Sequence, residues 1–188
     1  MGTYVDTSVI LSRYVPSDPN LKIVDRFFRN YSKTKYISEI SVLELHCVFA
    51  RLVRGGLLVA INEARDFDDL TVQQKVKVAV EHAVRTWRLT VIIPEKDSVK
   101  FPLSKQTLEV EYEVFEALRV SPRLGLKTLD TLHLVYARSI KDIAPDLETF
   151  TTLDRDITSR RQEIQDELDI EVVSPDASSV KSSVRNQL

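Results

Sequence analysis

With 188 residues, 43% of them apolar and 29% charged, the chain is typical of one soluble globular domain with a sizeable core. Its formal net charge of −2 does not by itself indicate a nucleic-acid-binding or membrane-surface protein. The single cysteine, Cys47, excludes an internal disulfide and a thiolate metal cluster, and we expect it to be a small buried side chain. Without a membrane-length apolar run or a recognisable signal segment, we expect a cytoplasmic protein that contacts no membrane.

The first predicted element is a buried strand that ends at Val5 and is followed at once by Asp6. β-Branched and aromatic residues on both sides of this point favour a strand. A carboxylate inside such an apolar run is unfavourable unless something neutralises it. Asp6 therefore either caps the turn that follows or binds a cation.

The next segments predict a helix from residue 21, a short strand at 35–38, and a second helix from Glu39 to about Val53 with Ser38 as its N-cap. Glu44 would lie within the apolar stripe of that second helix. It either pairs with Arg51 or His46 at the edge of the stripe, or it is a buried functional acid. The residues expected to form the stripe are Ile40, Leu43, Cys47 and Val48.

Gly55 and Gly56 end the second helix. Residues 57–69 then form either a continuing helical arm or an insertion that ends in the acidic turn Asp66-Phe67-Asp68-Asp69. We expect a helix that begins after Thr71, a strand over 89–93, a loop over 96–104, and a helix over 107–120 that ends before Ser121 and Pro122.

The last third contains two further acids at the ends of predicted elements. Asp130 lies in the first turn of a buried helix, where the helix dipole alone could favour it, and His133 follows one turn later on the same face. We expect His133 to be a hydrogen-bonded core histidine rather than a metal ligand. Asp154 follows a strand over 148–153 and either caps the next helix or joins the other acids. Asp156 is the other candidate for the fourth acid of the site, and we expect it to face solvent instead.

Strands alternate with helices along the chain, which predicts an α/β fold: a three-layer sandwich with a central parallel sheet. In such a sheet, residues that follow strand ends gather along one edge. Asp6, Glu44, Asp130 and Asp154 can all face that edge. Because clustered carboxylates repel one another and oxygen ligands suit hard cations, the pattern predicts a site for Mg²⁺ or Mn²⁺.

The same four positions resemble the motifs of PIN-domain nucleases, and more narrowly of VapC-type toxins of toxin–antitoxin pairs. The matching segments are Val5-Asp6-Thr7-Ser8, Ser41-Val42-Leu43-Glu44, the run from Leu129 and Asp130 to Ala137, and Thr152-Leu153-Asp154. The resemblance implies a PIN-like fold, an endoribonuclease that leaves a 5′-phosphate and a 3′-hydroxyl, an antitoxin partner and a homodimer.

For the site itself, we expect Asp6, Glu44, Asp130 and Asp154 to be catalytic and to hold the metal ions. Thr7, Ser8 and Thr152 would orient the carboxylates. Candidate RNA contacts are Arg13, Arg51, Arg54 and Arg155.

The chain is longer than the small toxins, with extra helical segments expected near 55–71 and 95–125. We predict a nuclease domain over 1–175 and a mobile tail over 176–188. Three alternatives to a toxin remain open: an RNA-processing nuclease, a catalytically silent PIN interaction module, and a haloacid-dehalogenase-type phosphatase. Ser8 argues against the phosphatase, which needs an acid at that position.

Overall fold

The computed structural model describes residues 1–15, 17–58, 67–95 and 97–177. A parallel sheet of five strands forms its centre, in the order β3-β2-β1-β6-β7. The strands are β1 (Gly2–Val5), β2 (Lys35–Ser38), β3 (Leu89–Ile92), β6 (Leu147–Thr151) and β7 (Glu171–Val173). The polar residues that follow β1 and β6 therefore meet at one edge of the sheet.

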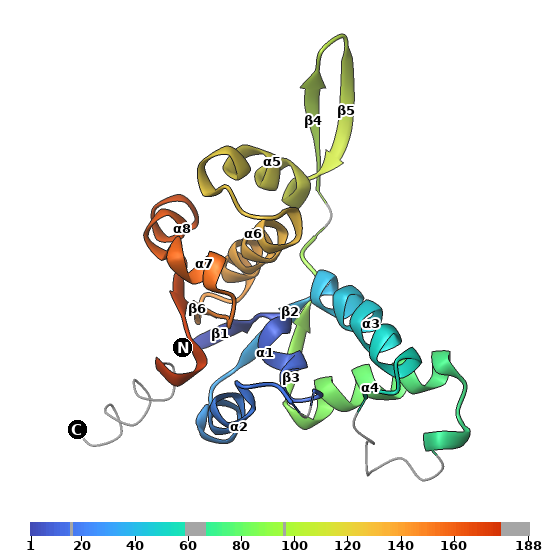
Figure 1. The fold of residues 1–188 in the computed structure, drawn as a ribbon. Helices are drawn as coiled ribbons and strands as arrows, with labels where there is room; N and C mark the ends of the chain where they lie inside the picture. Colours follow the sequence, from blue (N-terminus) through green and yellow to red (C-terminus); the bar gives the residue numbers. More distant parts are fainter. Residues whose placement is uncertain (16, 59–66, 96, 178–188) are drawn as a thin grey trace, which may run out of the picture.

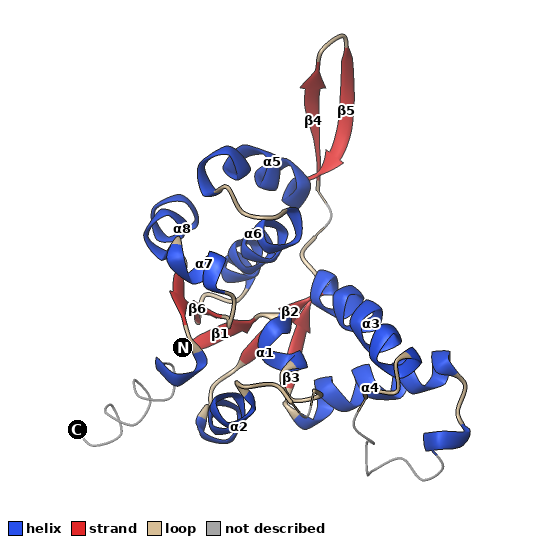
Figure 2. Cartoon of the chain, in the orientation of Figure 1, coloured by secondary structure: helices blue, strands red, loops and turns tan. Residues whose placement is uncertain are grey.

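Helices cover both faces of this sheet (Figures 1 and 2). On one face lie α1 (Thr7–Leu11), α2 (Leu21–Asn30), α3 (Glu39–Arg54) and α4 (Val72–Thr86), with a short 3₁₀ helix at Phe67–Asp69. On the other lie α5 (Tyr112–Leu124), α6 (Thr128–Ile143), α7 (Arg155–Ser159) and α8 (Arg161–Leu168).

Successive residues of the inner strands contribute to two separate cores. Val5 and Ile37 pack in the core below α1 to α4, whereas Tyr4 and Tyr36 pack in the core below α5 to α8. This alternation is what a strand covered on both faces requires. The predicted three-layer, PIN-like α/β sandwich is thus confirmed. None of the described helices is both long and apolar enough to cross a membrane.

The predicted loop over 96–104 and the first turns of the predicted helix over 107–120 are wrong. They form an antiparallel hairpin, β4 (Ser98–Leu103) and β5 (Gln106–Glu111), which projects from the body (Figure 1). Apolar and polar residues alternate along both strands, and this period of two overlaps the helical spacing that continues into α5. The extra segment near 95–125 is therefore only partly helical.

The helix α5 also continues through Pro122, where the sequence predicted it to end. Pro122 has no N–H to donate to the carbonyl of Leu118. The hydroxyl of Ser121 donates to that carbonyl instead, at 3.2 Å, and the helix ends at Gly125 with a φ of 59°. A side chain thus replaces the missing backbone hydrogen bond in the last turn.

The apolar stripe predicted on α3 is wrong in its orientation. Leu43 is 59% exposed and Cys47 is exposed, whereas Leu45 and Phe49 are fully buried. Because α3 is apolar around most of its circumference, the spacing alone fits more than one face. Ser38 occupies the N-cap as predicted, and Thr71 caps α4 through Gln74. The expected extra segment near 55–71 and the tail lie partly outside the described residues.

Candidate active site at the carboxyl edge of the sheet

Asp6 leaves β1 at the edge of the sheet and is almost fully buried. Its Oδ2 accepts hydrogen bonds from the hydroxyl of Ser8 at 2.6 Å and from that of Thr152 at 2.7 Å. Asp6 occupies the N-cap position of α1, but within the described ranges its side chain makes no capping hydrogen bond. The two hydroxyls instead fix its carboxylate in one orientation.

Asp130 lies in the first turn of α6 and carries an unsatisfied oxygen. Its Oδ2 is buried and has no hydrogen-bond partner in the part of the chain that the structure describes. Burial raises the pKa of Asp130, and the negative charges of Asp154 and Asp6 raise it further. The three carboxylates are therefore close enough to repel one another, and a cation would relieve both penalties.

Asp154 has the N-cap role that the sequence allowed and is at the same time a neighbour of Asp130. Its Oδ1 accepts from the backbone N–H of Asp156 at 2.7 Å and of Ile157 at 3.4 Å. The hydroxyl of Thr152 accepts from the N–H of Asp154 at 2.9 Å. Asp156 lies in the exposed first turn of α7, with its Oδ2 3.8 Å from Nζ of Lys127.

Glu44 is held by two donors at the inner side of the same edge. The hydroxyl of Thr7 donates to its Oε2, and Nε2 of His133 lies 2.9 Å from the same oxygen. Burial opposes the ionisation of Glu44, but the hydrogen bonds from His133 and Thr7, together with the positive charge of Arg51, lower its pKa. Glu44 is thus kept ionised by its neighbours.

Behind Glu44 lies a buried polar network that the sequence analysis did not identify. The hydroxyl of Tyr4 is 2.8 Å from the hydroxyls of both Ser38 and Ser41, and 3.0 Å from Nδ1 of His133. Burial raises the pKa of Tyr4, so its phenol keeps its proton. His133 is only 2% exposed and uses both ring nitrogens, which confirms the predicted hydrogen-bonded core histidine.

The sequence carries only a weak signal for this network: a tyrosine within β1, and two serines where β2 passes into α3. Tyr4, the serine pair Ser38 and Ser41, and His133 come from three segments far apart in the chain. Their meeting therefore depends on the register of β1 against β2, in which Tyr4 pairs with Tyr36.

The carboxylates approach one another without closing into a single cage. Among the described residues, no group of three or more His, Cys, Asp or Glu side chains forms a site ready to hold a metal ion. Mg²⁺ commonly keeps several of its waters and binds through only one or two carboxylates. Carboxylates that lie near one another without forming a closed cage therefore suit a hydrated ion. The unsatisfied Oδ2 of Asp130 is the observation that fits such an ion.

The four candidate arginines lie in different surroundings. Arg13 pairs with Asp25 at 2.8 Å and lies 4.9 Å from the ring centroid of Trp87, so its guanidinium already has partners. Arg51 is exposed, and its charge acts on Glu44. Arg155 is exposed at the start of α7. Arg54 lines a hollow of about 750 Å³ between α3 and α4.

Comparison with known proteins gives a likeness of fold. No family model matches the chain, and no curated protein matches it. Among solved structures, it is similar to a chain in the crystal structure of VapBC2 from Rickettsia felis bound to a DNA fragment from their promoter. The TM-score is 0.50 and the identity 12%, over 93% of this chain and 98% of that chain. The likeness supports a PIN-like, VapC-type fold.

Proposed function

We propose that this protein is an endoribonuclease that depends on Mg²⁺ or Mn²⁺. The observation that carries the proposal is the surroundings of Asp130. One of its oxygens is buried without a partner among the described residues, and the charges of Asp154 and Asp6 lie close by. A protein keeps such an arrangement at a cost in stability unless a cation balances it, and oxygen donors of this kind select hard divalent ions.

In this proposal Asp6, Glu44, Asp130 and Asp154 hold the ions. Bound divalent ions supply an activated water and stabilise the leaving oxygen of a phosphodiester. The chain's own contribution is orientation. Ser8 and Thr152 fix the carboxylate of Asp6, and Thr7 with His133 fixes that of Glu44. Such outer hydrogen bonds commonly change metal affinity or activity by about 10–100-fold when they are removed.

RNA is the proposed substrate, and the products would carry a 5′-phosphate and a 3′-hydroxyl, as the resemblance implies. Arg51 and Arg155 are the more suitable phosphate contacts because both are exposed, the charge of Arg51 acts on Glu44, and Arg155 directly follows Asp154. Arg54 is farther along α3, and Arg13 is a weaker candidate because Asp25 and Trp87 already contact it.

The biological role we propose is that of the toxin of a toxin–antitoxin pair, acting as a homodimer. The likeness of fold to a chain of the VapBC2 complex supports this role. An antitoxin segment would inhibit by placing an arginine among the same acids, because a guanidinium binds carboxylates through two parallel hydrogen bonds. An RNA-processing nuclease without a toxin role would use the same site.

Cleavage of single-stranded RNA by the purified protein tests the activity. We expect cleavage with Mg²⁺ or Mn²⁺ that stops on addition of a chelator. Asp6→Asn should abolish it with an unchanged far-UV circular dichroism spectrum, whereas the matched control Asp156→Asn should cleave like the wild type. Cleavage by Asp6→Asn at the wild-type rate would refute the assignment of the site.

Growth after expression in a bacterial host tests the role. The wild-type protein should arrest growth, and Asp6→Asn should not. Equal toxicity of the two proteins would contradict the toxin role. Absence of toxicity, with chelator-sensitive cleavage intact, would support RNA processing.

A second candidate function is that of a catalytically silent PIN-like interaction module. It is favoured by one observation: within the described ranges, no three acidic or histidine side chains form a site ready for a metal ion. Titration with Mn²⁺ separates the two candidates, since a silent module would show no saturable binding that Asp130→Asn weakens.

A further inference from the structure

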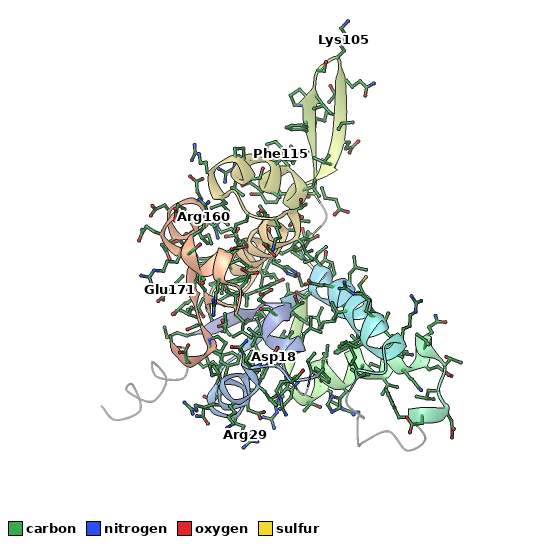
Figure 3. The ribbon with its side chains drawn as sticks, viewed as in Figure 1. Asp18, Arg29, Lys105, Phe115, Arg160 and Glu171 are labelled. Atoms are coloured by element: carbon green, nitrogen blue, oxygen red, sulfur yellow. The ribbon has the colours of Figure 1, made fainter. Side chains whose placement is uncertain are left out.

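Three helices on one face of the sheet enclose a small cavity. The helices α5, α6 and α8 pack against one another (Figures 1 and 3), and Figure 3 labels Phe115 on α5 and Arg160 at the start of α8. The cavity between them has a volume of about 270 Å³. Ser139, which lines it, follows Asp130 by nine residues on α6, or about 14 Å along the helix axis. The cavity is therefore separate from the candidate active site.

The hydroxyl of Ser139 is a buried polar group of this cavity that lacks a partner. Val135, four residues before it, and Asp142, three residues after it, also line the cavity, so this face of α6 forms one wall. Ser139 is 9% exposed, and its Oγ is buried with no hydrogen-bond partner among the described residues. Because buried polar groups are normally satisfied, this hydroxyl points to a ligand that hydrogen-bonds with it.

The charged side chains that line the cavity carry one more negative than positive charge. The acids are Glu116, Asp142 and Glu167, and the bases are Arg119 and Arg138. Both bases are already paired. Nε and Nη2 of Arg119 donate to Oε2 of Glu116 at 2.9 and 2.8 Å, and Nη1 of Arg138 donates to Oδ1 of Asp142 at 2.6 Å. The excess negative charge therefore belongs to Glu167.

The carboxylate of Glu167 is mostly buried but is only partly neutralised. Its side chain is 16% exposed, and Nη1 of Arg119 lies 3.7 Å from its Oε2, beyond hydrogen-bond distance. Its Oε1 accepts from Arg123, whose side chain is 69% exposed and does not line the cavity. Ion pairs with such exposed side chains contribute little. Oε2 of Glu167 is thus the acceptor that a cationic ligand would use.

The excess negative charge also acts on Tyr112, which lines the same cavity from the start of α5. Burial raises the pKa of Tyr112, and the charges of Glu116 and Asp142 raise it further; Arg138 and Arg119 oppose this to a smaller extent. The acids therefore outweigh the bases at this ring as well. The face of a tyrosine ring also attracts a cation that lies within about 6 Å of it.

We propose that this cavity binds a free, short aliphatic amine. Its ammonium group would donate to Oε2 of Glu167 and to Oγ of Ser139. Its alkyl chain would lie on Val135 and Leu168, which are buried apolar residues of the lining. An anion would be repelled by Glu167, and a hydrated metal ion would gain nothing from the apolar residues.

Isothermal titration calorimetry with n-butylamine at neutral pH tests the proposal, and n-butanol is the uncharged probe of matching length. Alkylamines, like lysine, are protonated at this pH. We expect saturable binding of one n-butylamine per chain and no saturable binding of n-butanol over the same concentrations. Absence of saturable n-butylamine binding, or equal binding of the two probes, overturns the proposal.

Three variants locate the binding. Glu167→Gln removes the charge and should weaken n-butylamine binding about 10–100-fold, and Ser139→Ala should weaken it about fivefold. The matched control Glu163→Gln changes an exposed glutamate of α8 that does not line the cavity, and it should bind like the wild type. Unchanged far-UV circular dichroism spectra would show that the variants keep the fold. Wild-type affinity in Glu167→Gln would contradict the assignment.

Asp130→Asn separates this cavity from the candidate active site, because an ammonium group could also bind among the acids there. We expect Asp130→Asn to bind n-butylamine with wild-type affinity. Loss of binding in that variant would place the amine at the active site and overturn the proposal. The measurement does not depend on RNA cleavage, so the amine site and the proposed nuclease can fail separately.

Discussion

Nε2 of His133 lies 2.9 Å from Oε2 of Glu44, and Nδ1 of the same ring lies 3.0 Å from the hydroxyl of Tyr4. Since a carboxylate can only accept, Nε2 of His133 donates to Glu44. The hydroxyl of Tyr4 also lies 2.8 Å from the hydroxyls of both Ser38 and Ser41. A chain of hydrogen bonds from the core thus sets the orientation of an acid at the site.

Replacing Tyr4 by phenylalanine should destabilise the protein. The change leaves the buried hydroxyls of Ser38 and Ser41 and Nδ1 of His133 without their shared partner, which costs about 1–3 kcal/mol. Urea unfolding measures the loss. Tyr112→Phe removes the hydroxyl of an exposed tyrosine and should change the stability by less than about 0.5 kcal/mol. Equal effects of the two substitutions would contradict the role of the network.

The stability of Asp130→Asn relative to the wild type should depend on pH in a defined direction. Because the pKa of Asp130 is raised in the folded state by burial and by Asp154 and Asp6, folding favours its protonated form. This contribution is fully present below the ordinary pKa of an aspartate and is lost as the pH rises through the raised value.

At neutral pH without metal, Asp130→Asn should therefore melt at a higher temperature than the wild type. The difference should shrink as the pH falls through the raised pKa of Asp130 and be nearly gone below the ordinary aspartate pKa of about 3.9. Thermal melts of both proteins across this range, in chelator, measure it. A difference that grows toward acid pH would show that the sign is wrong.

The two roles of Asp154 can be separated by one substitution. Asp154→Ser keeps an N-cap oxygen for the N–H groups of Asp156 and Ile157 but removes the carboxylate. We expect near wild-type stability and loss of RNA cleavage. Asp154→Ala should lose cleavage and also about 1 kcal/mol of stability, because the cap is gone. Asp156→Ala should cleave within a few-fold of the wild type. Retained cleavage in Asp154→Ser would exclude Asp154 from the site.

Mn²⁺ or Mg²⁺ should raise the melting temperature of the wild type, because an ion that binds only the folded state stabilises it by mass action. At one hundred times the dissociation constant the gain is about 2.7 kcal/mol. Each 1 kcal/mol corresponds to a rise of about 2–4 °C for a chain of this size. Asp6→Asn and Asp130→Asn should weaken the response, and Asp156→Asn should not. The four-carboxylate site would be misassigned if all variants respond alike.

The sequence alone was sufficient to predict the fold class and the edge of the sheet at which the acids lie. Strands that are apolar on both faces, each followed by a helix, require a parallel sheet, and Asp6 and Asp154 follow two of its strands directly. Because strand ends share an edge in such a sheet, local patterns determined which carboxylates would come close to one another. In the structure the charges of Asp154 and Asp6 raise the pKa of Asp130, so these three carboxylates lie near one another.

Only the tertiary structure decided three other features. In residues 98–111 apolar side chains recur at every second position, but part of the segment also fits a helical spacing. The pairing of Phe101 with Leu108 across the two strands selects the hairpin. The helix α3 is apolar almost all round, and the fit of Phe49 into the core selects its buried face. The contact of Tyr4 with His133 joins residues 129 positions apart. Each of these depends on packing between distant segments, which a local pattern does not contain.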